Sequence, residues 1–302
     1  MTSYPTEPLS GDERVPIGII GGSGLYDIDG LDAVETREID TPFGEPSAPV
    51  EIGELEGRRV AFLPRHGNAH QYSPTQVPYR ANIWALKRLG VFWVMTASAV
   101  GSLRKSIEPG DIVIPDQVID KTTQRANTLY DNLAVHVNLG RPYHPMLRKV
   151  LYEAGREVVG NTDQSIHDGA TYVCMEGPAF STKAESHMHR GWDADLVGMT
   201  AMPEARFARE AEMCYATIAM PSDYDVWRDD VPGVDVDDVM AILNRSTSLA
   251  RDILSRTIPR IPLEEESECD ASSALETAIM TRPEAISEET RRELAIFLND
   301  YL

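Results

Sequence analysis

The feature that most constrains how this chain can fold is a series of short apolar runs that end in small or polar residues. Residues 15–20 read VPIGII and lead straight into a Gly-Gly-Ser-Gly loop, and residues 91–96 read VFWVMT and lead into another small-residue segment. A run of this length without polar alternation predicts a strand that is buried on both faces. Strands of that kind occur where helices cover both sides of a sheet.

The same pattern recurs along the chain, with amphipathic segments between the runs. Further strands are predicted at 50–52, 59–63, 111–114, 118–119, 170–174, 194–199 and 213–220. Helices are predicted at 79–89, 144–159, 181–192, 203–212, 236–257 and 287–301, the last with Ser287 as N-cap. This alternation predicts an α/β protein, a single-domain mixed β-sheet flanked by helices.

A length of 302 residues fits one large domain with extensions. We expect a loose polar extension at 1–14, the domain itself at 15–262, and an acidic linker with a C-terminal helix at 263–302. The N-terminus lacks the basic start and apolar middle of a signal peptide, and no apolar run approaches the roughly 20 residues of a membrane helix. These features favour a cytoplasmic protein with no membrane contact.

The chain is strongly acidic, with a formal net charge of −20. Such a surface repels phosphate backbones, which argues against a nucleic-acid partner. Its 28 basic residues divide into 23 Arg and 5 Lys. An acidic surface with little Lys favours a salt-rich, halophilic setting, where repulsion is screened within a few ångströms, although an ordinary acidic protein remains the alternative.

Cysteine and histidine usage predicts neither a disulfide framework nor a metal site. Cys174, Cys214 and Cys269 are odd in number and show no CxxC spacing, so we expect buried thiols. His187 and His189 would point roughly 200° apart on a helix, so they cannot share one ion.

Polar groups follow several predicted strands and could together bind an anion. Ser23 lies in the first glycine loop, Arg65 and His66 follow the strand at 59–63, Ser98 and Ala99 follow 91–96, and Thr200 follows 194–199. Hydroxyls, exposed backbone N–H groups and an Arg fork are donors suited to phosphate, and ligands of open α/β sheets bind at strand ends. Each group alone fits an ordinary turn equally well.

Asp223 and Asp225 follow the strand at 213–220 and form a second candidate feature. Two carboxylates two residues apart in an extended segment can point the same way, and one can be held protonated to act as an acid. A solvated acidic turn is the alternative.

Seven segments occur in order along the chain: IGIIGGSGLYD (17–27), DTPFGEPS (40–47), RHG (65–67), GSLRKSIEPGDIVIPDQVIDKTTQR (101–125), EGPAFSTKAES (176–186), GMTAMPEA (198–205) and SDYDVW (222–227). Together they resemble the methylthioadenosine phosphorylases of the trimeric purine nucleoside phosphorylase family. The resemblance covers residues 17–260. It implies a nucleoside phosphorylase-like fold and phosphate-dependent cleavage of methylthioadenosine to adenine and 5-methylthioribose 1-phosphate. No metal or organic cofactor is implied, and inorganic phosphate is a co-substrate.

The resemblance also implies roles for residues at the family's positions. Phosphate binding would fall to Ser23, Arg65, His66, Ser98, Ala99 and Thr200. Nucleoside binding would fall to Phe180, Ser181, Met199, Asp223, Asp225, Val236 and Val239, and to His136 reaching into a neighbouring subunit. Asp223 would protonate the leaving adenine at N7, with Asp225 beside it. The implied assembly is a homotrimer, and pairing of trimers into a hexamer stays open.

Two residues bear on the base. Family members that cleave 6-oxopurines carry Asn in place of Asp223 and Glu in place of Ser181, so this chain is expected to favour a 6-aminopurine. Methylthioinosine, adenosine or a 6-oxopurine nucleoside remain alternative substrates. A nucleoside-binding protein without turnover is the alternative from another class. A dinucleotide-dependent oxidoreductase is disfavoured because the glycine loop lacks the third glycine of that fingerprint.

Overall fold

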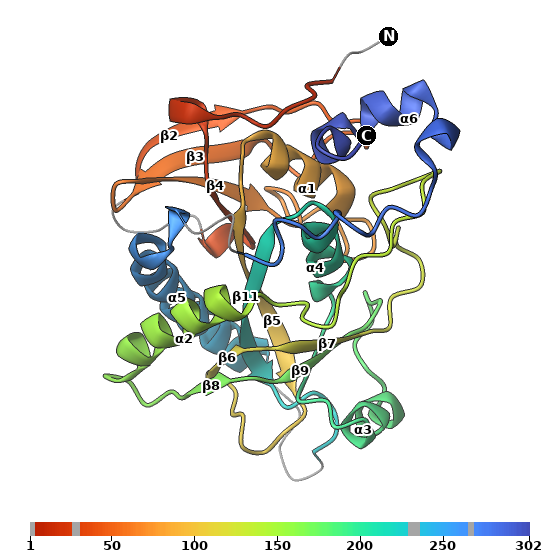
Figure 1. Ribbon diagram of the computed structural model, residues 1–302. Helices are drawn as coiled ribbons and strands as arrows, with labels where there is room; N and C mark the ends of the chain where they lie inside the picture. Colours follow the sequence, from red (N-terminus) through yellow and green to blue (C-terminus); the bar gives the residue numbers. More distant parts are fainter. Residues whose placement is uncertain (1–3, 26–30, 229–235, 265–268) are drawn as a thin grey trace.

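The computed structural model describes residues 4–25, 31–228, 236–264 and 269–302. Within these residues, eleven strands form one mixed sheet with the order β2-β3-β4-β1-β5-β10-β9-β7, and with β11, β6 and β8 branching from β5 (Figure 1). The strands are β1 (Ile17–Gly21), β2 (Asp32–Arg37), β3 (Val50–Leu55), β4 (Arg58–Pro64), β5 (Trp93–Ser102), β6 (Ile112–Ile114), β7 (Gln117–Asp120), β8 (Ile166–Asp168), β9 (Thr171–Cys174), β10 (Leu196–Gly198) and β11 (Cys214–Asp223).

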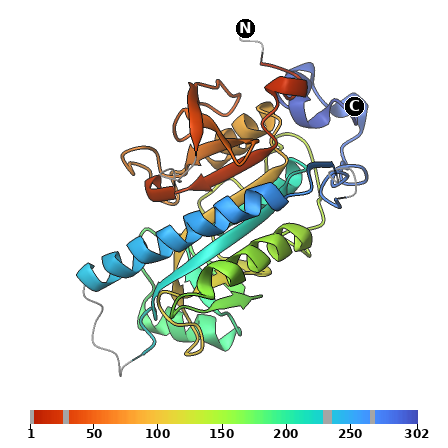
Figure 2. The same cartoon turned by 90° about the vertical axis from the view of Figure 1, so that its left-hand side faces the viewer.

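Helices cover both faces of this sheet. They are α1 (Tyr79–Arg88), α2 (Pro145–Val159), α3 (Lys183–Gly191), α4 (Ala201–Glu210), α5 (Val236–Thr257), α6 (Glu288–Glu293) and α7 (Ala295–Leu298). Figure 2 shows α2 and α5 side by side along β11, and α1 and α4 pack in the cluster on the opposite face. Alternate residues of β5, such as Trp93 and Val94, enter the two different hydrophobic clusters, as the pleat requires. This architecture confirms the predicted α/β class.

The central strand β5 explains where the site opens. Along one edge β5 pairs with β11 from Trp93 to Gly101, with a shift in register between Pro221 and Asp223 of β11. Along the other edge β5 pairs with β1 only as far as Thr96, and it pairs with β10 from Gly101 onward. Between these two points, this second edge of β5 has no strand neighbour among the described residues. The sheet splits there, and the gap lies at the carboxyl end of β1.

Several predicted boundaries differ from the structure. Ser98 and Ala99 were expected in a loop but belong to β5, and Asp223 belongs to β11, because the pairing of these two strands carries on past the apolar residues. Ser287 caps a helix as predicted, accepting a hydrogen bond from the Thr290 N–H. The predicted helix 287–301 is nevertheless two short helices, since the backbone leaves helical geometry at Leu294.

Both terminal segments lie against the domain. Leu9 N–H donates to the carbonyl of Arg88 at 2.9 Å, so the described part of the predicted loose extension is anchored to α1. Near the C-terminus, Phe297 is buried and packs its ring on Tyr130, with centroids 6.1 Å apart. The division at 14 and 262 stays a prediction, but both flanking segments contribute to the packing of the core.

Cysteine pairing differs from the expectation of three free thiols. The sulfurs of Cys214 and Cys269 lie in disulfide contact, and Cys174 is free and buried. The spacing of the cysteines in the sequence does not predict this contact. Cys269 is 55 positions from Cys214, and only folding of the C-terminal segment brings it to the start of β11. None of the described helices is both long and apolar enough to cross a membrane.

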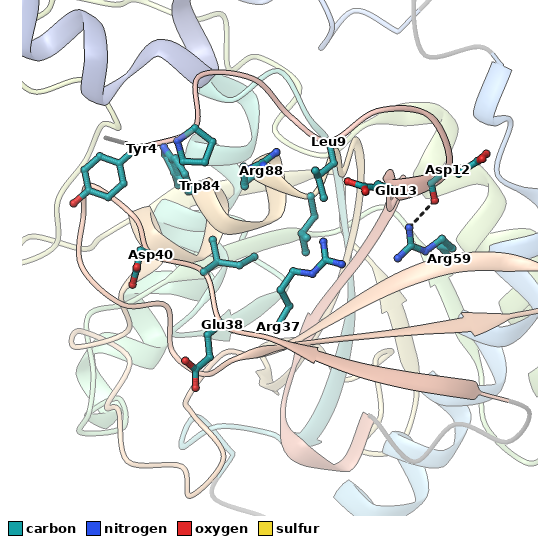
Figure 3. Close-up of a pocket in the computed structure, with 13 residues that line it drawn as sticks. Tyr4, Leu9, Asp12, Glu13, Arg37, Glu38, Asp40, Arg59, Trp84 and Arg88 are labelled. Carbon is teal, nitrogen blue, oxygen red and sulfur yellow. Dashed lines mark hydrogen bonds between the residues drawn. The ribbon is translucent and has the colours of Figure 1, made fainter. Parts of the chain in front are cut away.

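A cavity of about 760 Å³ lies under the N-terminal segment (Figure 3). Its walls mix apolar groups such as Leu9 and Trp84 with charges of both signs, including Asp12 and Arg59. Arg59 donates to the backbone carbonyl of Asp12 at 2.8 Å, which helps to hold the segment in place. None of the residues predicted to bind phosphate or nucleoside lines this cavity.

Candidate active site

A second cavity, of about 730 Å³, opens at the split in the sheet. Among its lining residues are eleven of the fourteen predicted site residues: Arg65, His66, Ser98, Ala99, Phe180, Ser181, Met199, Thr200, Asp223, Asp225 and Val239. They come from the second half of β5, from the ends of β4, β10 and β11, from the loop before α3, and, for Val239, from α5. Chain segments that are far apart in sequence therefore converge on one space, of the size that small-molecule sites usually have.

Three predicted residues are not placed there. The side chains of Ser23, in the turn after β1, and of Val236, the first residue of α5, lie outside the described part of the structure. His136 is exposed and lines a different cavity of about 460 Å³, where its backbone N–H donates to the carbonyl of Ala278. Its side chain therefore does not reach the cavity of its own chain.

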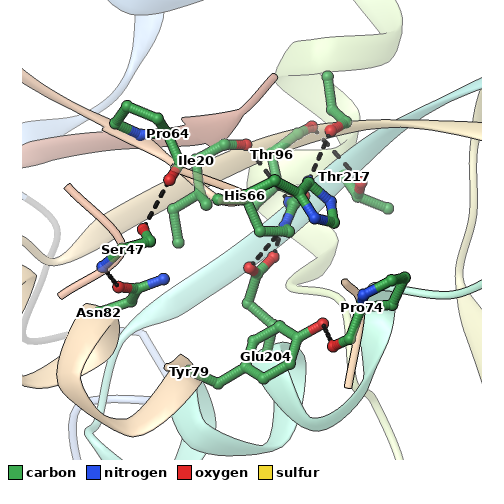
Figure 4. A network of polar contacts seen from close by, with 12 residues as sticks. Ile20, Ser47, Pro64, His66, Pro74, Tyr79, Asn82, Thr96, Glu204 and Thr217 are labelled. Carbon is green, nitrogen blue, oxygen red and sulfur yellow. Dashed lines mark hydrogen bonds and ion pairs between the residues drawn. The ribbon is translucent and has the colours of Figure 1, made fainter. Parts of the chain in front are cut away.

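Arg65 lines the cavity, and its partner Glu204 is labelled in the polar network of Figure 4. Its guanidinium is buried and forms a two-pronged ion pair with Glu204, with Nε–Oε2 at 2.8 Å and Nη2–Oε1 at 2.9 Å. Nη1 also donates to the carbonyl of Ala97, and Nη2 to that of Ile20 at 3.4 Å. Although burial acts to lower it, the Glu204 carboxylate holds the pKa of Arg65 above its ordinary value.

This pairing changes what Arg65 offers to an anion. A guanidinium has five N–H donors, and the contacts within the described residues use four of them. One donor on Nη1 remains, and the carboxylate of Glu204 already balances the positive charge. Any dianion bound here needs most of its hydrogen bonds from neighbouring hydroxyl and backbone groups.

His66 lies beside Arg65, with a defined orientation. Its Nδ1 is 2.9 Å from the carbonyl oxygen of Tyr72, so Nδ1 carries the proton, and the ring stacks on His70 with centroids 4.5 Å apart. Burial lowers the pKa of His66, so the ring is neutral near pH 7. In that state Nε2 accepts a hydrogen bond, which suits a phosphate oxygen that still carries a proton.

Gly198 permits a close approach on the β10 side of the cavity. A Cβ at this position would come within 2.0 Å of the hydroxyl oxygen of Tyr172 on β9, so only glycine lets the β10 backbone lie this close to the tyrosine side chain. Tyr172 is fully buried, and burial raises its pKa to about 12, so the phenol stays neutral. Met199 and Thr200 follow directly and line the cavity.

Asp223 and Asp225 occupy the other side of the cavity. The Asp223 carboxylate accepts hydrogen bonds from Ser222 Oγ at 2.7 Å and from the Asp225 N–H at 2.6 Å. Burial raises the pKa of Asp223, with the charge of Asp225 adding to the effect. Asp225 Oδ2 is buried and has no hydrogen-bond partner among the described residues. The pair therefore combines an acid with a raised pKa and an acceptor available to a ligand.

The loop before α3 supplies the remaining wall. Phe180 is 84% exposed, although it borders the cavity. The ring is therefore open to contact by a bound ligand. Ser181, by contrast, is buried, and its hydroxyl lies 3.6 Å from Met175 Sδ. Thr182 then starts α3 with a reciprocal capping box to Glu185, which fixes where the loop ends.

Arg125 is a residue that sequence reasoning missed. Its buried guanidinium donates to the backbone carbonyls of Met199 at 2.6 Å and Glu176 at 2.7 Å, and its Nε donates to the Glu176 carboxylate at 3.0 Å. It thus joins the loop that carries Thr200 to the loop that carries Phe180. A lone arginine after a predicted strand carries no such signal in the sequence, because its partners are mostly backbone oxygens.

Glu176 completes this connection. Burial acts to raise its pKa, but hydrogen bonds from Thr75 Oγ1, the N–H groups of Thr123 and Gln124, and Arg125 outweigh it and lower the pKa to about 2. The carboxylate is ionised at any ordinary pH and holds the segment around 123–125 against the loop at 176–181.

Known proteins resemble this chain along nearly its whole length. The family model described as the phosphorylase superfamily matches residues 16–259. The S-methyl-5'-thioadenosine phosphorylase of Geobacter sulfurreducens is 45% identical over 95% of this chain and 99% of its own length. That of Thermococcus kodakarensis is 49% identical over 86% of this chain and 98% of its own length.

Solved structures agree with this similarity. A methylthioadenosine phosphorylase from an Antarctic soil metagenomic library superposes with a TM-score of 0.90 at 44% identity, covering 95% of this chain and all of its own. The Schistosoma mansoni enzyme in complex with adenine gives a TM-score of 0.81 at 33% identity, covering 88% of this chain and 99% of its own. On sequence, fold and cavity together, this chain belongs to the phosphorylase superfamily.

Proposed function

We propose that this protein is an S-methyl-5'-thioadenosine phosphorylase, which cleaves S-methyl-5'-thioadenosine with inorganic phosphate to give adenine and 5-methylthioribose 1-phosphate. The observation that carries the proposal is a single cavity with anion-binding donors around Arg65 at one end and a buried acid, Asp223, at the other. Relatives with this activity in their names match nearly the whole chain.

In this mechanism a phosphate oxygen attacks C1′ while the bond from C1′ to N9 breaks. Positive charge develops on the sugar, and a phosphate dianion below it both stabilises that charge and forms the new bond. Arg65, His66, Ser23, Ser98, Ala99 and Thr200 are the proposed phosphate ligands. The reaction as proposed needs no metal or organic cofactor.

The leaving base requires a proton, and Asp223 is the proposed donor to N7. Burial raises its pKa above the ordinary value of an Asp, and that is the direction that a general acid requires. Asp225 faces the same base as a hydrogen-bond acceptor. Phe180 would cover the purine ring, and Met199 would contact the ribose.

The same geometry favours a 6-aminopurine substrate with an apolar 5′ group. The acceptor oxygens of Asp225 suit an exocyclic amine, whereas a 6-oxo group needs a donor there. Val239 and Leu243 of α5 line the cavity with apolar side chains. We assign Val236 to the same 5′-methylthio pocket from its position in the family pattern alone.

The direct test incubates the purified protein with methylthioadenosine, methylthioinosine or inosine, each with and without phosphate, and measures the free base. Phosphate-dependent adenine release that is clearly faster than hypoxanthine release supports the proposal. Faster hypoxanthine release would keep the reaction but overturn the assignment of the base. Binding of nucleoside by a folded protein, with no base released, would favour the alternative of a binding protein without turnover.

We further propose a homotrimer in which His136 reaches the cavity of a neighbouring subunit. The exposed position of His136, away from its own cavity, supports this arrangement. Light scattering during size-exclusion chromatography would give a mass near three chains, or near six if trimers pair. In a trimer, His136→Ala should raise the nucleoside KM without loss of assembly. A fully active monomer would contradict the proposal.

A cytoplasmic, salt-rich setting is the remaining part of the proposal. The net charge of −20, with Arg in large excess over Lys, supports it. Molar KCl screens repulsion between carboxylates at the surface to a few ångströms. We expect the thermal midpoint and the activity to be higher in molar KCl than in dilute buffer. Equal values in the two buffers would contradict salt adaptation.

A further inference from the structure

A second group of reactive side chains lies on the far side of the core from the active-site cavity. Cys214 begins β11, His144 is the N-cap residue of α2, and Cys269 lies in the C-terminal segment. All three are buried, and their ligand atoms lie within 4.8 Å of one another. None of them lines the active-site cavity, so the proposed reaction does not account for the cluster.

The backbone spacing of the cysteines suits a bridging ion better than a covalent bond. Their Cα atoms are 7.5 Å apart, whereas disulfides usually join Cα atoms about 4.4–6.8 Å apart. Two thiolates on a tetrahedral Zn²⁺, each about 2.3 Å from the ion, lie about 3.8 Å apart. An ion between the sulfurs therefore spans a wider backbone separation than a direct bond does.

His144 offers the third ligand. Its Nε2 lies 3.1 Å from Cys269 Sγ, and its Nδ1 is buried with no hydrogen-bond partner among the described residues. Nε2 is the nitrogen that faces the sulfurs, so it is the atom that would bind the ion. Two thiols and one imidazole are a donor set that selects Zn²⁺-like cations over Mg²⁺ or Ca²⁺.

The surroundings also fit the charge of such an ion. Asp270 Oδ1 lies 3.5 Å from His144 Nε2 and faces solvent, where it or a water molecule can complete a tetrahedron. Two thiolates, one carboxylate and one divalent cation leave a net charge of −1. Arg209, whose Nη1 is 3.4 Å from Asp270 Oδ1, balances that charge.

We propose that Cys214, Cys269 and His144 form a binding site for one thiophilic divalent cation in the reduced protein. Binding converts both thiols to thiolates and releases two protons to solvent, with no change of oxidation state. The ion would fasten the C-terminal segment to β11 and α2, so its role is structural and separate from catalysis. This proposal departs from the prediction, made from the sequence, that the chain has no metal site.

The test uses the full chain, reduced and treated with a chelator, and Zn²⁺ as the probe. We expect one Zn²⁺ per chain by elemental analysis after desalting, and a thermal midpoint that rises when Zn²⁺ is added back. Co²⁺ in place of Zn²⁺ should give the near-ultraviolet charge-transfer absorption of a thiolate ligand. Cys174→Ser is the matched control, because Cys174 is equally buried and outside the cluster.

Cys269→Ser and His144→Gln should each abolish the Zn²⁺-dependent rise in the thermal midpoint and the Co²⁺ absorption. Cys174→Ser should retain both. The proposal is overturned if reduced wild-type protein binds no Zn²⁺, or if Cys269→Ser binds it as well as the control does. Because neither readout depends on turnover, failure here leaves the proposed phosphorylase activity untouched.

Discussion

Asp223 is the residue on which the proposed chemistry most depends. Asn at this position keeps the shape of the side chain but has no acidic proton to give, and its single oxygen can accept only one of the two hydrogen bonds that the carboxylate accepts. We expect Asp223→Asn to lower kcat for methylthioadenosine by about 10²–10⁴-fold, the range that general acids contribute. Steady-state kinetics with both 6-amino and 6-oxo nucleosides would also show the preference moving toward 6-oxopurines. A variant that is folded and as fast as wild type would remove Asp223 from the role.

The pH dependence provides a second signature of the same residue. Only the protonated carboxyl donates, and burial raises the pKa of Asp223. Wild-type kcat should therefore decline as pH rises through that raised value, and Asp223→Asn should lack this decline. A pH–rate profile that is identical in the two proteins would assign the proton to another group.

For single residues, the sequence predicts which side chains meet in one site. It predicts their individual hydrogen-bond and ion-pair partners less reliably. Eleven of the predicted residues meet in one cavity because strand ends converge at the split beside β5. The pairing of Arg65 with Glu204 is not predictable in the same way, since the two residues are 139 positions apart and neither has a local pattern that marks the other. The contacts of Arg125 are not predicted either, because its partners are distant in sequence and are mostly backbone oxygens.

At the scale of elements, Arg125 connects the two loops that follow the neighbouring strands β9 and β10 at the cavity. Lysine has three donors on one nitrogen and cannot span both loops. We expect Arg125→Lys to raise KM for both phosphate and nucleoside and to lower kcat/KM by about 10²-fold, because misplacing reacting groups by about 1 Å costs that much. Arg260→Lys, at an exposed ion pair with Glu157, is the control and should change little.

Stability alone would not produce this result. If Arg125→Lys lowers the thermal midpoint but leaves both KM values and kcat unchanged, the arginine supports the fold without positioning the site. The two loops would then hold their geometry through other contacts, such as the hydrogen bond from Thr75 Oγ1 to Glu176.

The boundaries of helices and strands are predicted well where the pattern of apolar residues determines them. They are predicted poorly where pairing with another strand determines them. β1 and α2 lie close to their predicted ranges because their burial patterns are local. β5 and β11 extend beyond theirs because each strand provides hydrogen bonds for the other's polar end. The short strand β8 has no apolar run and exists through its pairing with β6.

At the scale of the whole molecule, Glu210 couples folding to pH. Burial raises its pKa to about 7, although hydrogen bonds from the Leu129 N–H and Thr128 Oγ1 oppose the shift. Between pH 4.5 and 7 the folded carboxyl keeps a proton that the unfolded chain releases. The free energy of unfolding should therefore fall by roughly 3 kcal/mol as pH rises across this range, then level off.

Glu210→Gln should remove this contribution, because its amide does not titrate. The difference in thermal midpoint between variant and wild type should shift in favour of the variant from pH 4.5 to about 7 and then level off up to pH 8. Glu153→Gln, at an exposed helix position, should show no such trend. A pH-independent difference for Glu210→Gln would mean that the pKa of Glu210 is the same in the folded and unfolded protein, which would contradict the raised value.

The proposed reaction forms a bond between phosphate and the ribosyl carbon C1′, and phosphorus NMR detects that bond directly. The protein is incubated with methylthioadenosine and inorganic phosphate until adenine appears. We predict a new phosphate-monoester resonance that grows in equal molar amount with adenine, as expected for 5-methylthioribose 1-phosphate. Adenine release with all phosphorus remaining as inorganic phosphate would mean that water attacks C1′, and the protein would be a hydrolase.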